Sequence, residues 1–168
     1  MTEKFTFFWK NRSPFSQWHM ATFEKDGVIF NCTEQYMMYK KAELFGDKNS
    51  MRQIIATNDP RAQKSLGRLV DNFNQQEWNE KRYGIVYDGN KLKFRQNPSM
   101  YQSLMETKGT TVVEASPYDK IWGIALNKED PRALDRSTWK GQNLLGEILT
   151  SLRDEFLDED EFLDDVIA

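Results

Sequence analysis

The sequence has few of the residues that most often carry metal and nucleophilic chemistry. It contains one cysteine, Cys32, and one histidine, His19, among 168 residues. A single cysteine excludes an internal disulfide, and the two residues together cannot supply the Cys/His set of a structural zinc site. They also exclude a Ser-His-Asp or Cys-His mechanism unless His19 serves it alone. Catalysis therefore has to rely on carboxylates and amines, and we expect no bound metal.

Long apolar runs and nucleotide-binding glycine patterns are absent as well. No stretch approaches the roughly 20 apolar residues that a membrane span needs, and the N-terminal residues lack the basic stretch and apolar core of a secretory signal. No Walker or dinucleotide-binding loop occurs. We therefore expect a cytoplasmic protein with no membrane partner and no cofactor.

The remaining composition is that of one globular domain with an acidic tail. The chain is 39% hydrophobic and 29% charged, and 11 Phe, 6 Tyr and 5 Trp supply bulk for a core. Residues 154–168 hold eight carboxylates and no Lys or Arg, so residues 1–153 carry a net charge of +5. We predict a domain over 1–153 and a tail over 154–168, part of which continues the last helix and packs down. Such a tail adds solubility, screens a basic cleft or binds a partner.

Periodicity and turn signals predict a single, predominantly helical α+β domain with a small β-sheet. Asp26-Gly27 between extended runs at 21–24 and 28–32 predicts a hairpin, and Thr33 offers an N-cap oxygen to a helix over 34–45. The other strands are expected at 5–9, 111–115 and 121–126, and the other helices at 50–56, 60–70, 75–96, 98–107 and 141–156.

Glu34 and Lys41 are seven residues apart in the helix expected over 34–45. At about 100° per residue this is about 700°, so both side chains project from nearly the same face. An isolated pair of this kind most often marks a solvated face. Met38 and Phe45 lie on the same stripe and make it partly apolar. That favours burial, where a charged group is retained only if it is paired or used.

A second polar segment runs from Glu114 to Gly123. Glu114 and Asp119 stand at the ends of expected short strands, beside Trp122. Such a loop can aim carboxylates at a sugar ring while Trp122 stacks on it and Gly123 permits close approach. The alternative is a turn in which Asp119 bonds local backbone and Trp122 lies in the core. These residues alone do not decide between the two.

The order and spacing of several blocks resemble the YbiA-like N-glycosidases of the NADAR superfamily, over about residues 5–153. The blocks are Ser13–Trp18, Thr33–Tyr36 continuing to Lys41, Leu66–Arg68, Lys93–Asn97, Glu114–Asp119 with Ile121–Gly123, and Gly141–Gly146. The resemblance implies a mainly helical α+β fold and cleavage of the bond between a nitrogen base or amine and a phosphate-bearing ribose. Members so described act on ribosylated intermediates of riboflavin synthesis, and relatives remove ADP-ribose from guanine.

Carried over position by position, five residues match the polar and aromatic lining of the family's pocket: Glu34, Lys41, Glu114, Asp119 and Trp122. We expect them to converge on one sheltered pocket. One departure is visible, because many members have Glu-His where this chain has Glu34-Gln35. Any role of that imidazole is therefore absent or filled by the amide.

Breaking a ribose C1′–nitrogen bond builds positive charge on the sugar and negative charge on the departing nitrogen. Glu114 or Asp119 is expected to stabilise the sugar and orient water, while the other protonates the base. Lys41 opens a second route, as the nucleophile that holds C1′ in a Schiff base. We favour that route because the leaving group is an amine-type nitrogen, with Glu34 shuttling protons or fixing a ribose hydroxyl.

The remaining candidates would bind the substrate. Trp18 and Trp122 are candidates to stack on the base, although core packing explains either one equally well. Arg12, Arg68 and Lys93 are candidates to meet the phosphate as charge-assisted donors. Asn143, near the expected start of the last helix, is a candidate donor to the sugar or phosphate.

Three functions remain open on these residues. The first is hydrolysis of a small phosphorylated N-riboside such as a ribosylaminopyrimidine phosphate. The second is removal of ADP-ribose from guanine in nucleic acid or nucleotides, for which the acidic tail is unfavourable. The third is a non-catalytic module that binds NAD or ADP-ribose derivatives. The sequence does not determine the oligomeric state.

Overall fold

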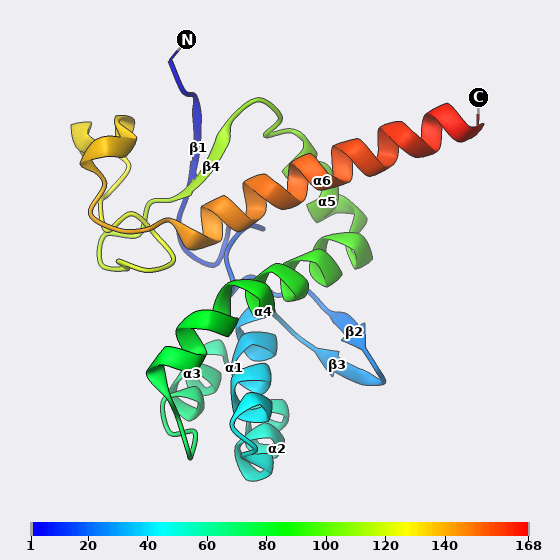
Figure 1. Ribbon diagram of the computed structural model, residues 1–168, viewed down its shortest axis with the longest axis vertical. Helices are drawn as coiled ribbons and strands as arrows, with labels where there is room; N and C mark the ends of the chain where they lie inside the picture. The colour runs from blue at the N-terminus through cyan, green and yellow to red at the C-terminus, as the bar shows by residue number, and fades with distance from the viewer. Residues whose placement is uncertain (1, 168) are drawn as a thin grey trace. The chain divides into compact units, whose positions relative to one another are not determined.

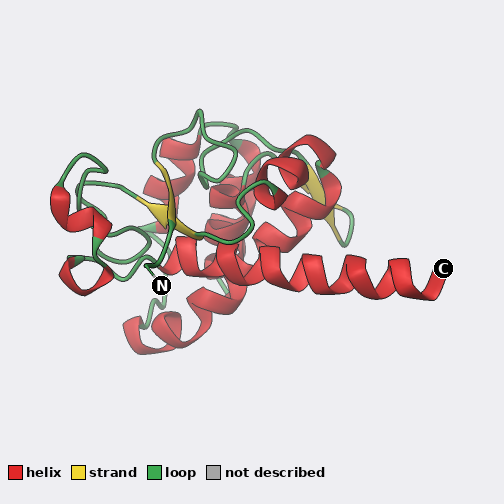
Figure 2. Ribbon diagram, turned by 90° about the horizontal axis from the view of Figure 1, so that it is seen from above, coloured by secondary structure: helices red, strands yellow, loops and turns green. Residues whose placement is uncertain are grey.

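The computed structural model describes residues 2–167, which form two short β-ribbons, six α-helices and two 3₁₀ helices, η1 (Pro131–Leu134) and η2 (Arg136–Thr138) (Figure 1). The strands are β1 (Phe5–Phe8), β2 (Phe23–Lys25), β3 (Val28–Phe30) and β4 (Thr111–Glu114). The helices are α1 (Thr33–Leu44), α2 (Lys48–Ala56), α3 (Pro60–Gly67), α4 (Gln75–Gln96), α5 (Pro98–Met105) and α6 (Leu144–Ile167). This is the predicted α+β class, and helix predominates clearly (Figure 2). No helix among residues 2–167 combines the length and apolar character needed to cross a membrane.

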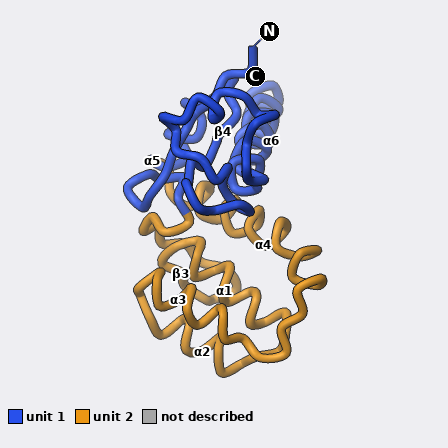
Figure 3. The backbone as a smooth tube through the Cα atoms, turned by 90° about the vertical axis from the view of Figure 1, so that its left-hand side faces the viewer, with its two compact units in different colours: residues 1–16, 99–168 blue, residues 17–98 orange. Residues whose placement is uncertain are grey.

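The chain divides into two units (Figure 3). Unit 2 is continuous, from Gln17 to Pro98, and holds the β2–β3 hairpin with α1 to α4. Unit 1 combines the N-terminal segment up to Ser16 with the chain from Ser99 onward, and it holds β1, β4 and α6. The split separates the predicted site residues into two groups, because Glu34 and Lys41 belong to unit 2 and Glu114 belongs to unit 1.

Helix α1 is the centre of unit 2, with α2, α3 and α4 all packed against it. Seven of its residues are buried, including the polar Glu34 and Gln35. It begins at Thr33 with Cys32 as the N-cap, which makes no side-chain cap hydrogen bond. The predicted Thr33 cap is therefore wrong by one position. The Thr33 hydroxyl instead donates to the Gln17 carbonyl oxygen at 3.3 Å, so it ties the helix start to the preceding loop.

The β2–β3 hairpin closes on α1 through three aromatic rings. Phe23 and Phe30 face each other across the antiparallel pair, with ring centroids 5.5 Å apart. Tyr36 of α1 packs edge-on against Phe30 at 5.1 Å. The turn uses Asp26 and Gly27 at positive φ values of 52° and 82°, the conformation that a two-residue hairpin of this sequence requires. The hairpin prediction is confirmed.

Helix α4 is continuous through Asp88-Gly89-Asn90, the three residues that also suited a tight turn. Gly89 explains the helix, because a Cβ atom there would lie 2.6 Å from Cδ1 of Tyr36. The missing side chain lets α4 approach the aromatic cluster closely. Asn90 lies fully buried one residue later and donates to the Gln17 side chain at 3.0 Å. Helical packing therefore outweighs the local turn preference.

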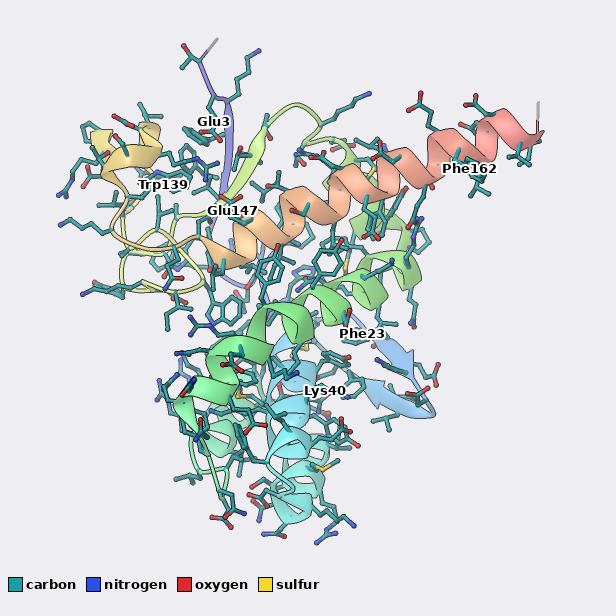
Figure 4. The ribbon with its side chains drawn as sticks, in the orientation of Figure 1. Glu3, Phe23, Lys40, Trp139, Glu147 and Phe162 are labelled. Carbon is teal, nitrogen blue, oxygen red and sulfur yellow. The ribbon has the colours of Figure 1, made fainter. Side chains whose placement is uncertain are left out.

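In unit 1, β1 and β4 pair in parallel, with Phe8 opposite Glu114. One face of this ribbon carries a core of Val113, Ala115, Ile124, Leu126 and Ala133, onto which Phe5, Phe7 and Trp139 pack. Helix α6 packs against β4, and its buried face includes Leu145, Ile148, Leu149, Leu152 and Phe156. Arg136 pairs at 2.5 Å with Glu3 in the N-terminal segment and with Glu147 in the first turn of α6; Figure 4 labels both glutamates.

The strand predicted at 121–126 is wrong, because the structure has turns and bends there. Two local causes bend the chain. The Asp119 carboxylate accepts hydrogen bonds from the amides of Ile121 and Trp122, both at 2.9 Å. Ala125 then adopts a left-handed φ of 56°. An apolar run of this length suits a strand by periodicity alone, so the buried loop could not be distinguished from it.

The acidic tail continues α6 as expected, up to Ile167. Phe156 is completely buried, and its ring is tilted against that of Tyr101 of α5 with centroids 5.4 Å apart. Contact with α5 continues to Asp160, which accepts a hydrogen bond from Tyr101, whereas Phe162 is 67% exposed and Ile167 is 83% exposed. The tail therefore packs down in part, as expected, over about its first two turns.

Candidate active site

Lys41 lies in the last turn of α1, and two aromatic rings flank its ammonium group. The Nζ atom is 4.6 Å from the ring centroid of Phe73 and 5.5 Å from that of Trp78. The lysine is half-buried, Trp78 is buried, and Phe73 remains 41% exposed. Contacts of this length between an ammonium and a ring face are cation–π interactions. The amine is thus held in a defined position at a surface that a ligand can reach.

Three effects act on the pKa of Lys41, and burial is the largest. Burial lowers the pKa from its ordinary value because a partly desolvated ammonium is less stable. The negative charge of Glu34 acts in the opposite direction, and the positive charge of Arg68 lowers the pKa further. The net effect is a lowered pKa. Lys41 therefore releases its proton more readily than a surface lysine, as a nucleophilic amine requires.

Glu34 is the second residue of α1 and is only 4% exposed. Its backbone amide donates to the Gln17 carbonyl oxygen at 3.0 Å, which fixes the start of the helix. Its charge acts on Lys41 two turns later, in agreement with the common face that their spacing predicts. A buried carboxylate that interacts with an amine of lowered pKa is a typical arrangement for proton transfer.

Gln35, where many family members have histidine, is a structural residue. Its Oε1 atom accepts from the Asn31 amide at 2.7 Å, and its Nε2 atom donates to the carbonyl oxygens of Ile54 and Thr57 at 3.0 and 3.2 Å. An amide can accept once and donate twice in this way, whereas a neutral imidazole has one donor and one acceptor. The side chain connects the hairpin end to the end of α2, which leaves it no catalytic donor.

The basic candidates in unit 2 lie in different environments. Arg68 follows α3, is exposed, and is close enough to Lys41 to affect its pKa. Lys93 is completely buried in α4, and burial lowers its pKa to about 7. Trp18 is half-buried, with the Lys64 Nζ atom 6.0 Å from its ring centroid. The predicted contact of Arg68 with a phosphate stays a prediction that its exposure allows, and the burial of Lys93 does not favour that role.

In unit 1, Glu114 is the last residue of β4, and the backbone on both sides of it is held firmly. Its amide donates to the Asn143 side chain at 2.9 Å, and its carbonyl oxygen accepts from the Ile124 amide at 3.0 Å. The residue is half-buried. Arg12, also in unit 1, is exposed on the loop after β1.

Asp119 forms the local turn that was one of its two alternatives. Its Oδ1 atom accepts hydrogen bonds from the amides of Ile121 and Trp122. The Trp122 side chain is half-buried. Gly123 permits close approach as expected, but the approaching group is protein: a Cβ atom there would lie 2.8 Å from the Glu114 carbonyl oxygen. The turn therefore supports Glu114 directly.

Asn143 is buried and has a left-handed φ of 53°. Its side-chain oxygen accepts from the Glu114 amide, and its Nδ2 atom donates to the Val112 carbonyl oxygen at 3.1 Å. The amide thus bonds to two residues on one edge of β4 and positions Glu114. Its predicted contact with a sugar or phosphate stays a prediction, which these two hydrogen bonds do not favour.

The sequence did not predict two residues that lie near Lys41, Phe73 and Trp78. Phe73 sits in a turn beside Asn72, which has a φ of 61°, and Trp78 lies in the first turn of α4. Neither belongs to a motif. The sequence signal for both is their place on either side of Asn74, the N-cap residue of α4.

The predicted site residues thus form two groups, one around Lys41 in unit 2 and one around Glu114 in unit 1. Their convergence on one pocket stays a prediction. Among residues 2–167, no three His, Cys, Asp or Glu side chains gather in a way that could hold a metal ion.

Comparisons with known proteins place the chain in a family. The NADAR domain family matches residues 7–157. Over 165 residues the chain is 41% identical to N-glycosidase R617 of Acanthamoeba polyphaga mimivirus. This alignment covers 92% of this chain and 97% of that protein. Over 149 residues it is 34% identical to the chloroplastic riboflavin biosynthesis protein PYRR of Arabidopsis thaliana, covering 85% of this chain and 23% of that protein. The NMR structure of YbiA from E. coli has the same fold, with a TM-score of 0.77 at 21% identity over 95% of this chain and 89% of that one.

The fold is therefore that of the YbiA-like proteins, and the enzyme class that the sequence predicts, an N-glycosidase, is confirmed. The chain belongs to the NADAR domain family.

Proposed function

We propose that this enzyme hydrolyses the N-glycosidic bond of a ribosylated, phosphate-bearing amine or base, with Lys41 as the nucleophile. The observation that carries the proposal is the setting of the Lys41 amine: half-buried, against two aromatic rings, and lowered in pKa. The names of the mimivirus and plant relatives, an N-glycosidase and a riboflavin biosynthesis protein, support a ribosylaminopyrimidine phosphate as the type of substrate.

The proposed reaction begins with opening of the ribosylamine ring, which gives an imine between C1′ and the substrate nitrogen. The neutral Lys41 amine adds to C1′, the bond from C1′ to the substrate nitrogen breaks, and the free amine or base leaves with a proton. Lys41 then holds C1′ as a Schiff base. Water adds to C1′, releases ribose phosphate as its aldehyde and restores the Lys41 amine.

Within this scheme Glu34 takes and returns the protons that Lys41 exchanges, because it is buried and interacts with that amine. The exposed guanidinium of Arg68 suits the substrate phosphate. Phe73 offers an exposed ring next to Lys41 for the base to stack on. Glu114 is proposed to act on the same substrate as a carboxylate near C1′, with Asn143 and Asp119 holding it in place.

Product analysis by mass spectrometry on a panel of N-ribosyl substrates tests the substrate class. The panel contains a ribosylaminopyrimidine phosphate and a single-stranded oligonucleotide ADP-ribosylated on guanine. We expect ribose phosphate from the first. Release of ADP-ribose from the second alone would instead identify the enzyme as an ADP-ribosyl hydrolase. Affinity for ADP-ribose without turnover of any substrate would indicate a binding module.

The neighbouring lysine gives a matched control for the nucleophile. Lys40 lies on α1 next to Lys41 and pairs with Glu43 at 2.5 Å (Figure 4). We expect Lys41→Ala to reduce turnover by about 10³-fold or more, and Lys40→Ala to change it less than about threefold. Equal losses in both variants would show that the effect comes from the helix and not from the amine.

Borohydride reduction during turnover tests the Schiff base itself. We expect a stable sugar adduct on the peptide that contains Lys41, identified by peptide mapping. Lys93, the lysine whose pKa is lowered to about 7, is the alternative site that the mapping distinguishes. An active enzyme that yields no adduct on either lysine would favour direct attack by water.

A further inference from the structure

The C-terminal end of α6 carries an exposed apolar stripe. The exposed fractions of Phe162, Leu163, Val166 and Ile167 are 67%, 52%, 66% and 83%. Asp160 accepts a hydrogen bond from Tyr101 of α5, and beyond this point the ribbon of α6 extends away from α5 with Phe162 on it (Figures 1 and 4). We name residues 158–167 the acidic helix end. Four large apolar side chains in two turns of an exposed helix are typical of a binding face.

The charge of the acidic helix end is unfavourable where it stands. It contains six carboxylates, of which those of Asp158, Glu161, Asp164 and Asp165 are exposed, and the last turn has no basic residue. The C-terminus of a helix carries the negative end of its dipole, so carboxylates there destabilise it, as does their mutual repulsion. A cationic surface with an apolar centre would relieve both effects.

Unit 2 has a surface of that kind between α1 and α2. A groove of about 470 Å³ is lined by Val28, Tyr39, Met51 and Ile55, with Lys48 and Arg52 among its lining residues. We name this the α1–α2 groove. Its volume lies within the range of pockets that hold ligands in proteins, and its apolar side chains match the stripe of the acidic helix end in character.

The ionic surroundings of the α1–α2 groove are net positive. Glu43 also lines it, but this carboxylate is already paired with Lys40. Lys48 and Arg52 are exposed, and neither forms an ion pair with any other residue in 2–167. The groove thus presents two available cations to an incoming helix that carries six carboxylates.

We propose that this chain self-associates, with the acidic helix end of one copy bound in the α1–α2 groove of a second copy. The apolar side chains at 162, 163, 166 and 167 follow the i, i+3, i+4 spacing by which an amphipathic helix occupies a groove. A second copy is the occupant because the same chain carries both complementary surfaces. The contact is heterologous, so it can repeat from copy to copy.

Sedimentation equilibrium of the full chain tests the association. The buried area is small, so we expect a dissociation constant on the order of 10–100 µM, with an average mass that rises above 19.8 kDa as the concentration increases. Because the contact is partly ionic, the rise is expected to weaken at high salt. A chain that remains monomeric to about tenfold above that range would overturn the proposal.

Single substitutions at exposed positions identify the two surfaces without disturbing the core. Phe162→Asp on the acidic helix end and Arg52→Glu in the groove are each expected to abolish the concentration dependence. The matched controls are Leu134→Asp, at an apolar residue of unit 1 that is 65% exposed, and Lys81→Glu, at an exposed cation of α4. Controls that lose association equally would show that charge or solubility alone is responsible.

Mixing the two damaged chains gives the decisive result. The Phe162→Asp chain keeps an intact groove and the Arg52→Glu chain keeps an intact helix end, so each is expected to be monomeric alone. Together at equal concentration they can form one contact, and we expect a discrete two-chain complex. A mixture in which both chains remain monomeric would contradict the proposed pairing, because the mixture contains one intact groove and one intact acidic helix end.

Discussion

The protein holds the Lys41 amine and the Glu114 carboxylate in different ways. Lys41 projects from a helix against two aromatic rings, and burial together with the charges of Glu34 and Arg68 shifts its pKa. Glu114 ends a strand, and hydrogen bonds of its own amide and carbonyl set its backbone position. The first region therefore controls the pKa of a reactive amine, and the second controls the direction of a carboxylate. Substitutions of the charges around Lys41 should therefore change the pH dependence of turnover, whereas substitutions that remove the hydrogen bonds around Glu114 should lower the stability.

After the loss expected for Lys41→Ala, the largest effect is expected at Glu114. Glu114→Gln retains the shape of the side chain and all backbone hydrogen bonds, so we expect turnover to fall by about 10²-fold or more with an unchanged unfolding transition. Asp119→Asn is the control, because its side-chain oxygen still accepts from Ile121 and Trp122. Steady-state kinetics on both variants measures the difference. A larger loss in Asp119→Asn would assign the chemistry to Asp119 and the architecture to Glu114.

The next effect tests whether Asn143 positions Glu114. Asn143→Ala removes both hydrogen bonds to β4 and places an alanine at positive φ, so we expect a loss of about 2–3 kcal/mol in the free energy of unfolding. Asn127→Ala, at an exposed turn of the same unit, should lose only about 0.5 kcal/mol. Urea unfolding of both variants checks this. Similar losses would show that the buried amide has no special role.

Lys93 allows a test of burial in unit 2 that is independent of activity. Its folded pKa is about 7, whereas the unfolded chain holds the proton up to the ordinary lysine value. Between these limits the unfolded state binds more protons, so stability rises with pH, at up to about 1.4 kcal/mol per pH unit. Lys93→Met should flatten this slope in urea unfolding at pH 7.5 to 9.5. An unchanged slope would mean that Lys93 stays charged in the folded protein.

The smallest expected effects are shifts in the pH dependence of turnover, and they have opposite signs. Turnover through Lys41 needs the neutral amine, so it rises with pH through the pKa of Lys41. Arg68→Gln removes a charge that lowers this pKa, so the rise should move to higher pH. Glu34→Gln removes a charge that raises it, so the rise should move to lower pH.

The same pair of variants separates proton transfer from electrostatics. Glu34→Gln should also depress turnover at every pH if Glu34 carries protons, whereas Arg68→Gln should mainly weaken substrate affinity. An unshifted pH dependence in both variants would show that neither charge acts on Lys41. The rate of chemical labelling of Lys41 against pH provides a readout that does not depend on catalysis.

Local signals were sufficient for most of the elements. The Asp26-Gly27 turn, the proline at the start of α3 and the apolar spacing of α6 each mark an element whose stability is largely local. They failed at 121–126, where an apolar run folds as a buried loop because Asp119 caps the turn and Ala125 takes a left-handed conformation. Such a loop depends on contacts with Glu114, which is not adjacent to it in sequence.

The sequence indicated which polar residues belong to the candidate site, but it did not indicate what each of them does there. The sequence indicated Asp119 as a catalytic carboxylate and Asn143 as a donor to the substrate, whereas the side chains of both bond backbone groups. Lys93 was selected for phosphate because of its charge, but the structure buries it completely. Phe73 and Trp78 carried no motif, and they enter the site because α4 packs against α1.

By itself, the sequence determined the helical α+β class, the spacing that puts Glu34 and Lys41 on one face, and the charge imbalance of the tail. These follow from periodicity and composition, which are properties of neighbouring residues. The tertiary structure decided that Lys41 is half-buried and Lys93 completely buried, and that the Asp119 carboxylate supports a turn. Desolvation and hydrogen bonding depend on what packs around a group, and those partners come from distant segments of the chain.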